Sequence, residues 1–147
     1  MRTAFVSALL AAAVTCAVAP KAPAQDQYMA QADSQLARIK RTLGPRYSES
    51  RQMIHWRFTQ GTPISQDFNW DRATYVVAAA GDNDVTAITL RLYDAHDALV
   101  AADTSGSRTP RITVTVPDYS TFYRLESTIT GCNQYPCYMA LMPYRRQ

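Results

Sequence analysis

The stretch that most constrains the fold of this chain is residues 81–104, GDNDVTAITLRLYDAHDALVAADT. Within it, Ile88, Leu90 and Leu92 alternate with polar neighbours. This two-residue period is typical of a strand that buries one face. A turn-rich stretch at residues 94–97 follows, and a second apolar run begins directly after it. The pattern predicts a β-hairpin, and we expect the rest of the chain to pack around it.

Strand-like patterns recur along the remaining chain, and turn residues separate them at intervals of roughly 8–12 residues. They cover residues 52–59, 72–80, 111–116, 121–129 and 138–144. We expect residues 45–52 to form a polar connector and residues 64–71 to form a loop whose Phe68 and Trp70 pack under the sheet edge. The spacing predicts a mainly β fold, an antiparallel, jelly-roll-like β-sandwich of about seven strands.

Residues 25–43 carry the one clear helical pattern. Apolar residues recur at steps of three and four: Met29, Ala32, Leu36, Ile39 and Leu43. This spacing places them on one helix face, and a Gly-Pro pair ends the helix. We favour docking of this face on the sheet. The alternative is a structural subunit that self-associates as an oligomer, with Met29, Leu36, Ile39 and Leu43 forming the seam between copies.

The first 24 residues have the features of a secretory signal peptide. Arg2 precedes an apolar run at residues 4–19, and an Ala-x-Ala cleavage site follows at residues 22–24. The run is too short for a comfortable membrane span, which needs about 20 residues. The alternatives are an uncleaved anchor and lipidation at Cys16, although Thr15 fits a lipoprotein signal poorly. We expect a periplasmic or secreted protein with no stable membrane span after cleavage.

Cleavage at this site sets the expected domain organisation. It leaves about 123 residues, enough for one domain with a real core. We expect the signal peptide at residues 1–24, the N-terminal helix at residues 25–44 and the β-sandwich domain at residues 45–147. Loss of Arg2 and Lys21 lowers the formal net charge from +3 to about +1. This charge gives no support to a nucleic-acid partner, which would need a clustered basic surface.

Two cysteines, Cys132 and Cys137, remain in the mature chain. In an oxidising compartment they predict one disulfide. A redox role is the alternative, but the spacing is C-x4-C rather than C-x-x-C and no helical pattern follows. We therefore interpret the pair as a structural bond that pins a hairpin or the start of a strand.

Acidic residues bracket the central hairpin, and they are the candidate metal ligands: Asp82, Asp84, Asp94, Asp97 and Asp103. Hard oxygen donors suit calcium, provided that the loops that carry them meet. The spacing does not match an EF-hand, because Ala87 and Tyr93 stand where that loop requires glycine and glutamate. The alternative is that these residues serve turns, which Asp favours without any ion.

No motif of a known catalytic site occurs in the sequence. His55 and His96 belong to no recognised ligand spacing, and we interpret both as ordinary surface residues. The mature chain has only Glu49 and Glu126 as glutamates, so a paired-carboxylate glycosidase would have to use aspartates. We expect no enzyme activity and, calcium aside, no cofactor. A small secreted hydrolase is the remote alternative.

Basic side chains concentrate in the N-terminal part of the mature chain: Arg38, Lys40, Arg41, Arg46, Arg51 and Arg57. Such a bias would steer the protein towards an anionic surface or an acidic partner. The alternative is a solvated helix face. Three aromatic residues, Tyr119, Phe122 and Tyr135, are candidates for an exposed recognition patch.

Several motifs over residues 59–144 resemble those of the bacterial pre-peptidase C-terminal domain. They are Tyr75-Val76-Val77, Gly81-Asp82, Leu90-Arg91-Leu92-Tyr93-Asp94, Leu99-Val100, Asp103, Tyr123-Arg124-Leu125 and Tyr138. The chain departs from that family at residues 87–90 and at His96-Asp97, where the family has an Asp-Leu-Asp-Leu-like run and a glycine. The resemblance implies a secreted β-sandwich that binds or assists outside the cytoplasm without catalysis.

These observations together favour a non-catalytic exported binding or accessory module of the bacterial envelope. Its partner would be a protein or another envelope component. The self-associating structural subunit and the small hydrolase are the alternatives.

Overall fold

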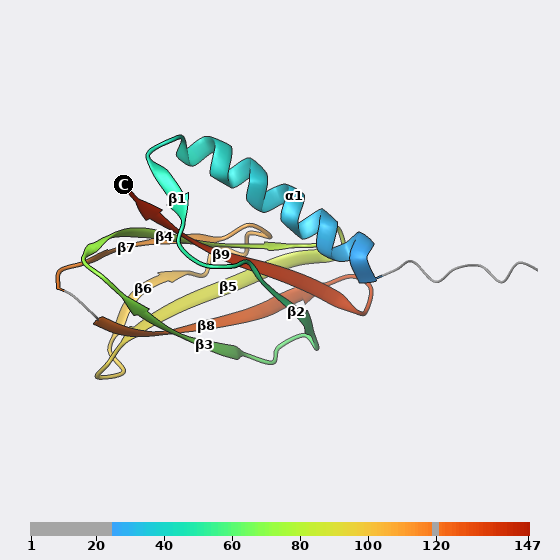
Figure 1. Cartoon of the computed structure of the whole chain (residues 1–147). Helices are drawn as coiled ribbons and strands as arrows, with labels where there is room; N and C mark the ends of the chain where they lie inside the picture. The colour runs from blue at the N-terminus through green and yellow to red at the C-terminus, as the bar shows by residue number, and fades with distance from the viewer. Residues whose placement is uncertain (1–24, 119–120) are drawn as a thin grey trace, which may run out of the picture.

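The computed structural model describes residues 25–118 and 121–147 of the chain. The predicted signal peptide, with Cys16 in it, and Tyr119 lie outside the described residues. The elements are α1 (Gln25–Leu43), β1 (Tyr47–Glu49), β2 (Ile54–Phe58), β3 (Ile64–Trp70), β4 (Ala73–Gly81), β5 (Val85–Asp94), β6 (Leu99–Asp103), β7 (Arg111–Val116), β8 (Thr121–Cys132) and β9 (Cys137–Arg146). The strands form two packed antiparallel sheets, and α1 lies on the outside of one of them (Figure 1).

The strand order identifies the fold as a jelly-roll sandwich. Sheet A has the order β2–β9–β4–β7, and the short β1 pairs with the C-terminal end of β9. Sheet B has the order β3–β8–β5–β6. Successive strands from β2 to β9 cross between the sheets, except at the β5–β6 hairpin, which is the arrangement of a jelly roll. The predicted mainly β, antiparallel sandwich with one N-terminal helix is confirmed.

The prediction was wrong for residues 64–71, which form strand β3 rather than a loop. Ile64 to Trp70 pair with β8 along the edge of sheet B. Phe68 and Trp70 are buried, while Ser65, Asp67 and Asn69 on the other face of the strand are exposed. Gln66 pairs with buried Leu125 and places a polar residue in the inward phase, so it interrupts the apolar alternation that would have indicated the strand. The connector expected at residues 45–52 likewise contains the short β1.

The core between the two sheets is built around the β5–β6 hairpin. Ile88, Leu90 and Leu92 are completely buried, as their alternation predicts. They pack with Leu125 and Ile129 of the neighbouring strand β8. The aromatic rings of Phe68, Trp70 and Tyr75 stack in succession at one end of this core.

Helix α1 covers the outer face of sheet A and forms a second core there. Leu36 is completely buried against the small side chains Ala78 and Ala140 on β4 and β9, which allow the helix to approach closely. The buried hydroxyl of Tyr144 donates a hydrogen bond to the carbonyl of Leu36 at 3.2 Å. Burial raises the pKa of Tyr144 to about 12. The apolar face of the helix therefore docks on its own sheet, which was the interpretation we favoured.

The docked helix also bears on the self-association hypothesis. Leu36 and Ile39 are buried within one chain, and Met29 and Leu43 are partly exposed. A seam between copies through all four residues would require α1 to leave sheet A. Self-association through α1 stays a prediction. Within residues 25–118 and 121–147, no helix is long and apolar enough to cross a membrane.

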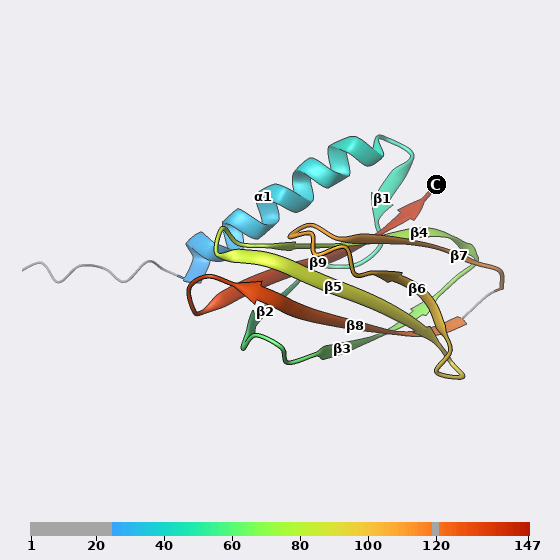
Figure 2. The same cartoon turned by 180° about the vertical axis from the view of Figure 1, so that it is seen from behind.

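The outer face of sheet B is not covered by α1, which lies on the opposite side of the sandwich (Figure 2). The two broad surfaces of the molecule therefore differ. One is formed by α1 and the flanks of sheet A, and the other is the outer face of the four-stranded sheet B, over which no described helix lies.

Candidate functional site

Asp82 lies in the turn between β4 and β5, at one end of the sandwich. The turn is tight, because a Cβ atom at Gly81 would lie 2.3 Å from that of Val85. The Asp82 carboxylate is completely buried, and it accepts hydrogen bonds from the N–H groups of Asp84, Val85 and Tyr138. Burial raises the pKa of Asp82, and the three backbone donors oppose this rise. Asp82 therefore ties the β4–β5 turn to the start of β9.

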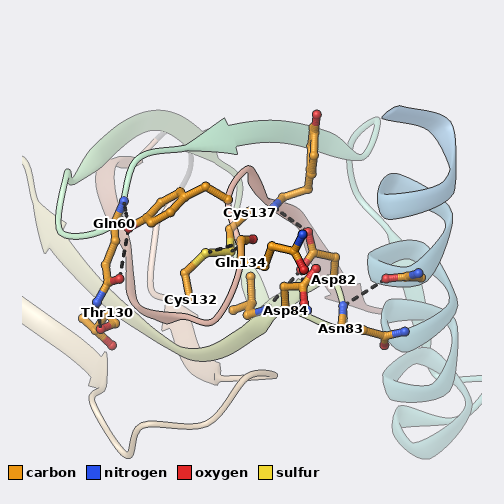
Figure 3. The surroundings of a disulfide bond; sticks show 12 residues. Gln60, Asp82, Asn83, Asp84, Thr130, Cys132, Gln134 and Cys137 are labelled. Atoms are coloured by element: carbon orange, nitrogen blue, oxygen red, sulfur yellow. Dashed lines mark hydrogen bonds between the residues drawn. A yellow bond between two sulfur atoms is a disulfide. The ribbon is translucent and has the colours of Figure 1, made fainter. Parts of the chain in front are cut away.

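The Cys132–Cys137 disulfide lies beside this turn (Figure 3). The two Cα atoms are 6.3 Å apart, and the bond joins the end of β8 in sheet B to the start of β9 in sheet A. The N–H of Asn133 donates to the carbonyl of Asp84 at 2.8 Å, so the disulfide loop and the β4–β5 turn support each other. The predicted disulfide is confirmed, and its place at the junction of the two sheets fits a structural role.

The remaining candidate calcium ligands lie elsewhere. Asp94 and Asp97 flank the β5–β6 turn, which β5 separates from Asp82 and Asp84 by about 30 Å. Asp94 accepts the N–H groups of His96 and Ala98.

The other two carboxylates also have partners from the protein. Asp97 pairs with Arg124, and Asp103 accepts hydrogen bonds from Ser105 and from the N–H of Arg111. Among the described residues, no three His, Cys, Asp or Glu side chains are grouped as metal ligands. The five aspartates thus do not converge on one site, and four of them serve turns or an ion pair. Calcium binding itself stays a prediction.

One of the two histidines makes a contact that the sequence analysis missed. The Nε2 atom of His55 on β2 lies 2.6 Å from the Oδ1 atom of Asp33 on α1. Both side chains are partly exposed, and the pair clips the helix to the edge strand. Nothing in the local sequence links residues 22 positions apart, so only the docking of α1 reveals this pair. His96 is exposed in the β5–β6 turn.

A polar groove separates α1 from the loops at the Asp82 end of the sandwich. It has a volume of about 590 Å³ and is lined by Gln31, Ser34, Gln35, Arg38, Asn83, Arg108 and Thr109. We call it the arginine groove. Hydrogen bonds hold its walls together: Gln31 accepts from the N–H of Asn83 at 3.0 Å, and Gln35 donates to the carbonyl of Gly81 at 2.9 Å. Arg38 was among the basic residues singled out above, whereas Arg108 was not.

The open outer face of sheet B carries a second candidate site. Arg124 of β8 lies over the ring of Tyr93 of β5, 4.5 Å from its centroid. Its guanidinium also pairs with Asp97 at 2.9 Å and with Glu126.

Apolar side chains accompany this cluster. Phe122 is 43% exposed, and Leu99 on the neighbouring edge strand is 55% exposed. We call the surface formed by Tyr93, Leu99, Phe122, Arg124 and Glu126 the sheet B face. Of the three aromatic residues expected to be exposed, Phe122 belongs to this face. Tyr135 is exposed in the disulfide loop, where its hydroxyl donates to Gln60.

Comparison with models of known protein families and with curated proteins finds no match to this chain. The resemblance to the pre-peptidase C-terminal domain therefore rests on the motifs alone.

Proposed function

We propose that the mature chain is an exported, non-catalytic binding or accessory module of the bacterial envelope that docks a partner on the sheet B face. The proposal rests chiefly on one observation: Arg124 is held in place by Asp97, Glu126 and the ring of Tyr93 on an open sheet. Arginine and aromatic residues dominate the binding energy of protein interfaces. A guanidinium that is ordered before binding loses little conformational entropy on contact with a partner.

Other features support this proposal. The disulfide is compatible with a location outside the cytoplasm. The carboxylate of Asp82, whose pKa burial raises, is engaged by backbone donors rather than directed at a cavity. A non-catalytic module outside the cytoplasm is also what the resemblance to the pre-peptidase C-terminal domain implies. The partner is proposed to be a protein or another envelope component.

The test is capture from the envelope fraction of the source cells by immobilised mature protein. Two variants, Arg124→Gln and Phe122→Ser, alter the sheet B face. Arg41→Gln is the matched control, because it removes one exposed guanidinium from α1 on the other side of the sandwich. We expect one partner to be captured equally by the wild type and by Arg41→Gln, and at least about tenfold less by either face variant.

Circular dichroism of each variant would establish that it is folded. If the face variants capture the same partner as efficiently as the wild type, or if the wild type captures none, the proposal is wrong.

A further inference from the structure

The arginine groove brings together two cations, neither of which has a carboxylate partner in the part of the chain that the structure describes. Arg38 projects from α1, and Arg108 belongs to the loop between β6 and β7. None of the described residues that line the groove is acidic. Among residues 25–118 and 121–147, neither arginine has a carboxylate within ion-pair distance, whereas Arg124 on the opposite face has two. The groove therefore presents uncompensated positive charge from two walls.

The guanidinium of Arg108 is positioned and yet has unused donors. Its Nη2 atom donates to the Asn83 side chain at 3.2 Å and approaches the carbonyl of Asp82 at 3.5 Å. Its Nε–H is buried without an acceptor among the described residues. Buried donors of this kind are uncommon, and a ligand in the groove reaches this one only if the guanidinium rotates, because the Nε atom is covered. Arg108 approaches the backbone carbonyl of Asp82 and makes no ion pair with its carboxylate, whose oxygens accept from the N–H groups of Val85 and Tyr138.

The neutral residues of the groove add to its donors. Gln31 accepts the Asn83 N–H through its side-chain oxygen, which leaves its amide NH₂ as a donor. The side-chain amide of Gln35 donates to the carbonyl of Gly81 and so holds α1 against the β4–β5 turn, which fixes the distance between the two walls. Figure 3 shows Asn83 at the turn beside this helix.

We propose that the arginine groove binds a phosphate group, with Arg38 and Arg108 contacting it from opposite walls. A tetrahedral oxyanion accepts hydrogen bonds on all sides, and arginine is well suited to bind phosphate through two parallel bonds. Inorganic phosphate or a phosphate monoester carries a charge of about −1.5 to −2 at pH 7, which matches two guanidinium groups better than the single charge of a carboxylate does. The site is independent of the sheet B face, and the proposal does not rest on the function proposed above. The phosphate belongs either to a soluble phosphate ester or to a phospholipid headgroup.

The first measurement is a titration of the ¹⁵N-labelled mature protein with inorganic phosphate, followed by NMR at constant ionic strength, with sodium chloride as the control salt. We expect saturable shifts of the Asn83, Arg108 and Thr109 amides with phosphate and none with chloride. Arg38→Gln should weaken phosphate binding at least about tenfold, because it removes one of two charge-assisted contacts. Arg41→Gln, which removes a guanidinium from the same helix outside the groove, should bind as the wild type does.

A second variant, at Arg108, distinguishes a loss of phosphate binding from a loss of folding. Arg108→Lys keeps the charge but removes the bidentate geometry, and we expect intermediate binding with an unchanged melting temperature. Two further titrations distinguish the sources of the phosphate: glycerol 3-phosphate, and vesicles of phosphatidylglycerol against vesicles of phosphatidylcholine. Equal effects of phosphate and chloride, or wild-type phosphate binding by Arg38→Gln, would show that the groove is not a phosphate site.

Discussion

The carboxylate of Asp82 accepts a hydrogen bond from the backbone N–H of Tyr138 at 2.8 Å, across 56 positions of sequence. The same carboxylate accepts hydrogen bonds from the N–H groups of Asp84 and Val85. One buried side chain therefore links the β4–β5 turn to strand β9. The disulfide reinforces the same junction from the β8–β9 loop.

Replacement of Asp82 by asparagine is expected to destabilise the protein by about 2–3 kcal/mol, because the amide NH₂ would face a buried N–H donor. Urea denaturation of the mature protein measures the loss. Asp84→Asn is the matched control, since Asp84 is partly exposed and only its backbone takes part in the hydrogen bonds of this turn. If the two variants lose equal stability, Asp82 does not have the linking role that we assign to it.

Asp94 is expected to contribute to the loss of the free energy of unfolding at acidic pH. The N–H groups of Ala98 and His96 lower its pKa below the usual 3.8. A lowered folded-state pKa adds stability above pH 3.8, and this stability is lost as the pH falls through the folded-state value. Asp94→Ala should therefore be less stable than the wild type at neutral pH, and the difference should shrink at about pH 2.

Asp94→Asn is the control for this experiment, because its amide oxygen can accept the same two bonds and does not titrate. Chemical denaturation at several pH values provides the comparison. A difference between the wild type and Asp94→Ala that is independent of pH would contradict the expected role of the charge.

Leu36→Ala tests whether α1 is part of the core. Leu36 is completely buried against sheet A, so its truncation should cost about 3 kcal/mol. Leu99→Ala makes the same chemical change at a 55% exposed position and should cost less than about 0.5 kcal/mol. Thermal melts monitored by circular dichroism measure the stability of each variant, and light scattering measures its molecular mass. Together they distinguish a helix that is part of the core from one that forms an interface between copies. A Leu36→Ala variant that keeps full stability but changes from oligomer to monomer would support the self-association alternative instead.

The disulfide is expected to make a modest contribution to the free energy of unfolding. Cys132 and Cys137 close a loop of five positions, for which the loop-entropy model gives about 2 kcal/mol. The double variant Cys132→Ala, Cys137→Ala should lose about this much stability in urea. Reductant should lower the wild type to the same level and leave the variant unchanged. No effect of reductant on the wild type would argue against a stabilising bond.

Much of the fold could be predicted where the pattern of side chains is local. The alternation of Ile88, Leu90 and Leu92 predicted their burial, and the spacing of Leu36 and Ile39 predicted the docked helix face. Strand β3 escaped prediction because Gln66 interrupts its apolar alternation, and its pairing with β8 depends on residues more than fifty positions away.

The candidate sites were much less accessible to prediction. Asp82 was a candidate calcium ligand on its residue type, with a role in a turn as the other interpretation, and the structure shows its buried carboxylate accepting backbone bonds of the β4–β5 turn. Asp94 and Asp97 were grouped with it because they are near in sequence, yet an extended strand places them at the other end of the sandwich. Arg108 carried no signal, because a single arginine in a polar loop is unremarkable.

By itself, the sequence of this protein determined which residues form most strands, which helix face is buried and which cysteines pair. These properties follow from backbone geometry over a few residues, where the side-chain period equals the strand or helix period. Only the tertiary structure decided that Arg38 and Arg108 line one groove, that Asp33 meets His55 and that Asp82 reaches Tyr138. Those contacts depend on how strands cross between the two sheets, and no local period encodes that crossing.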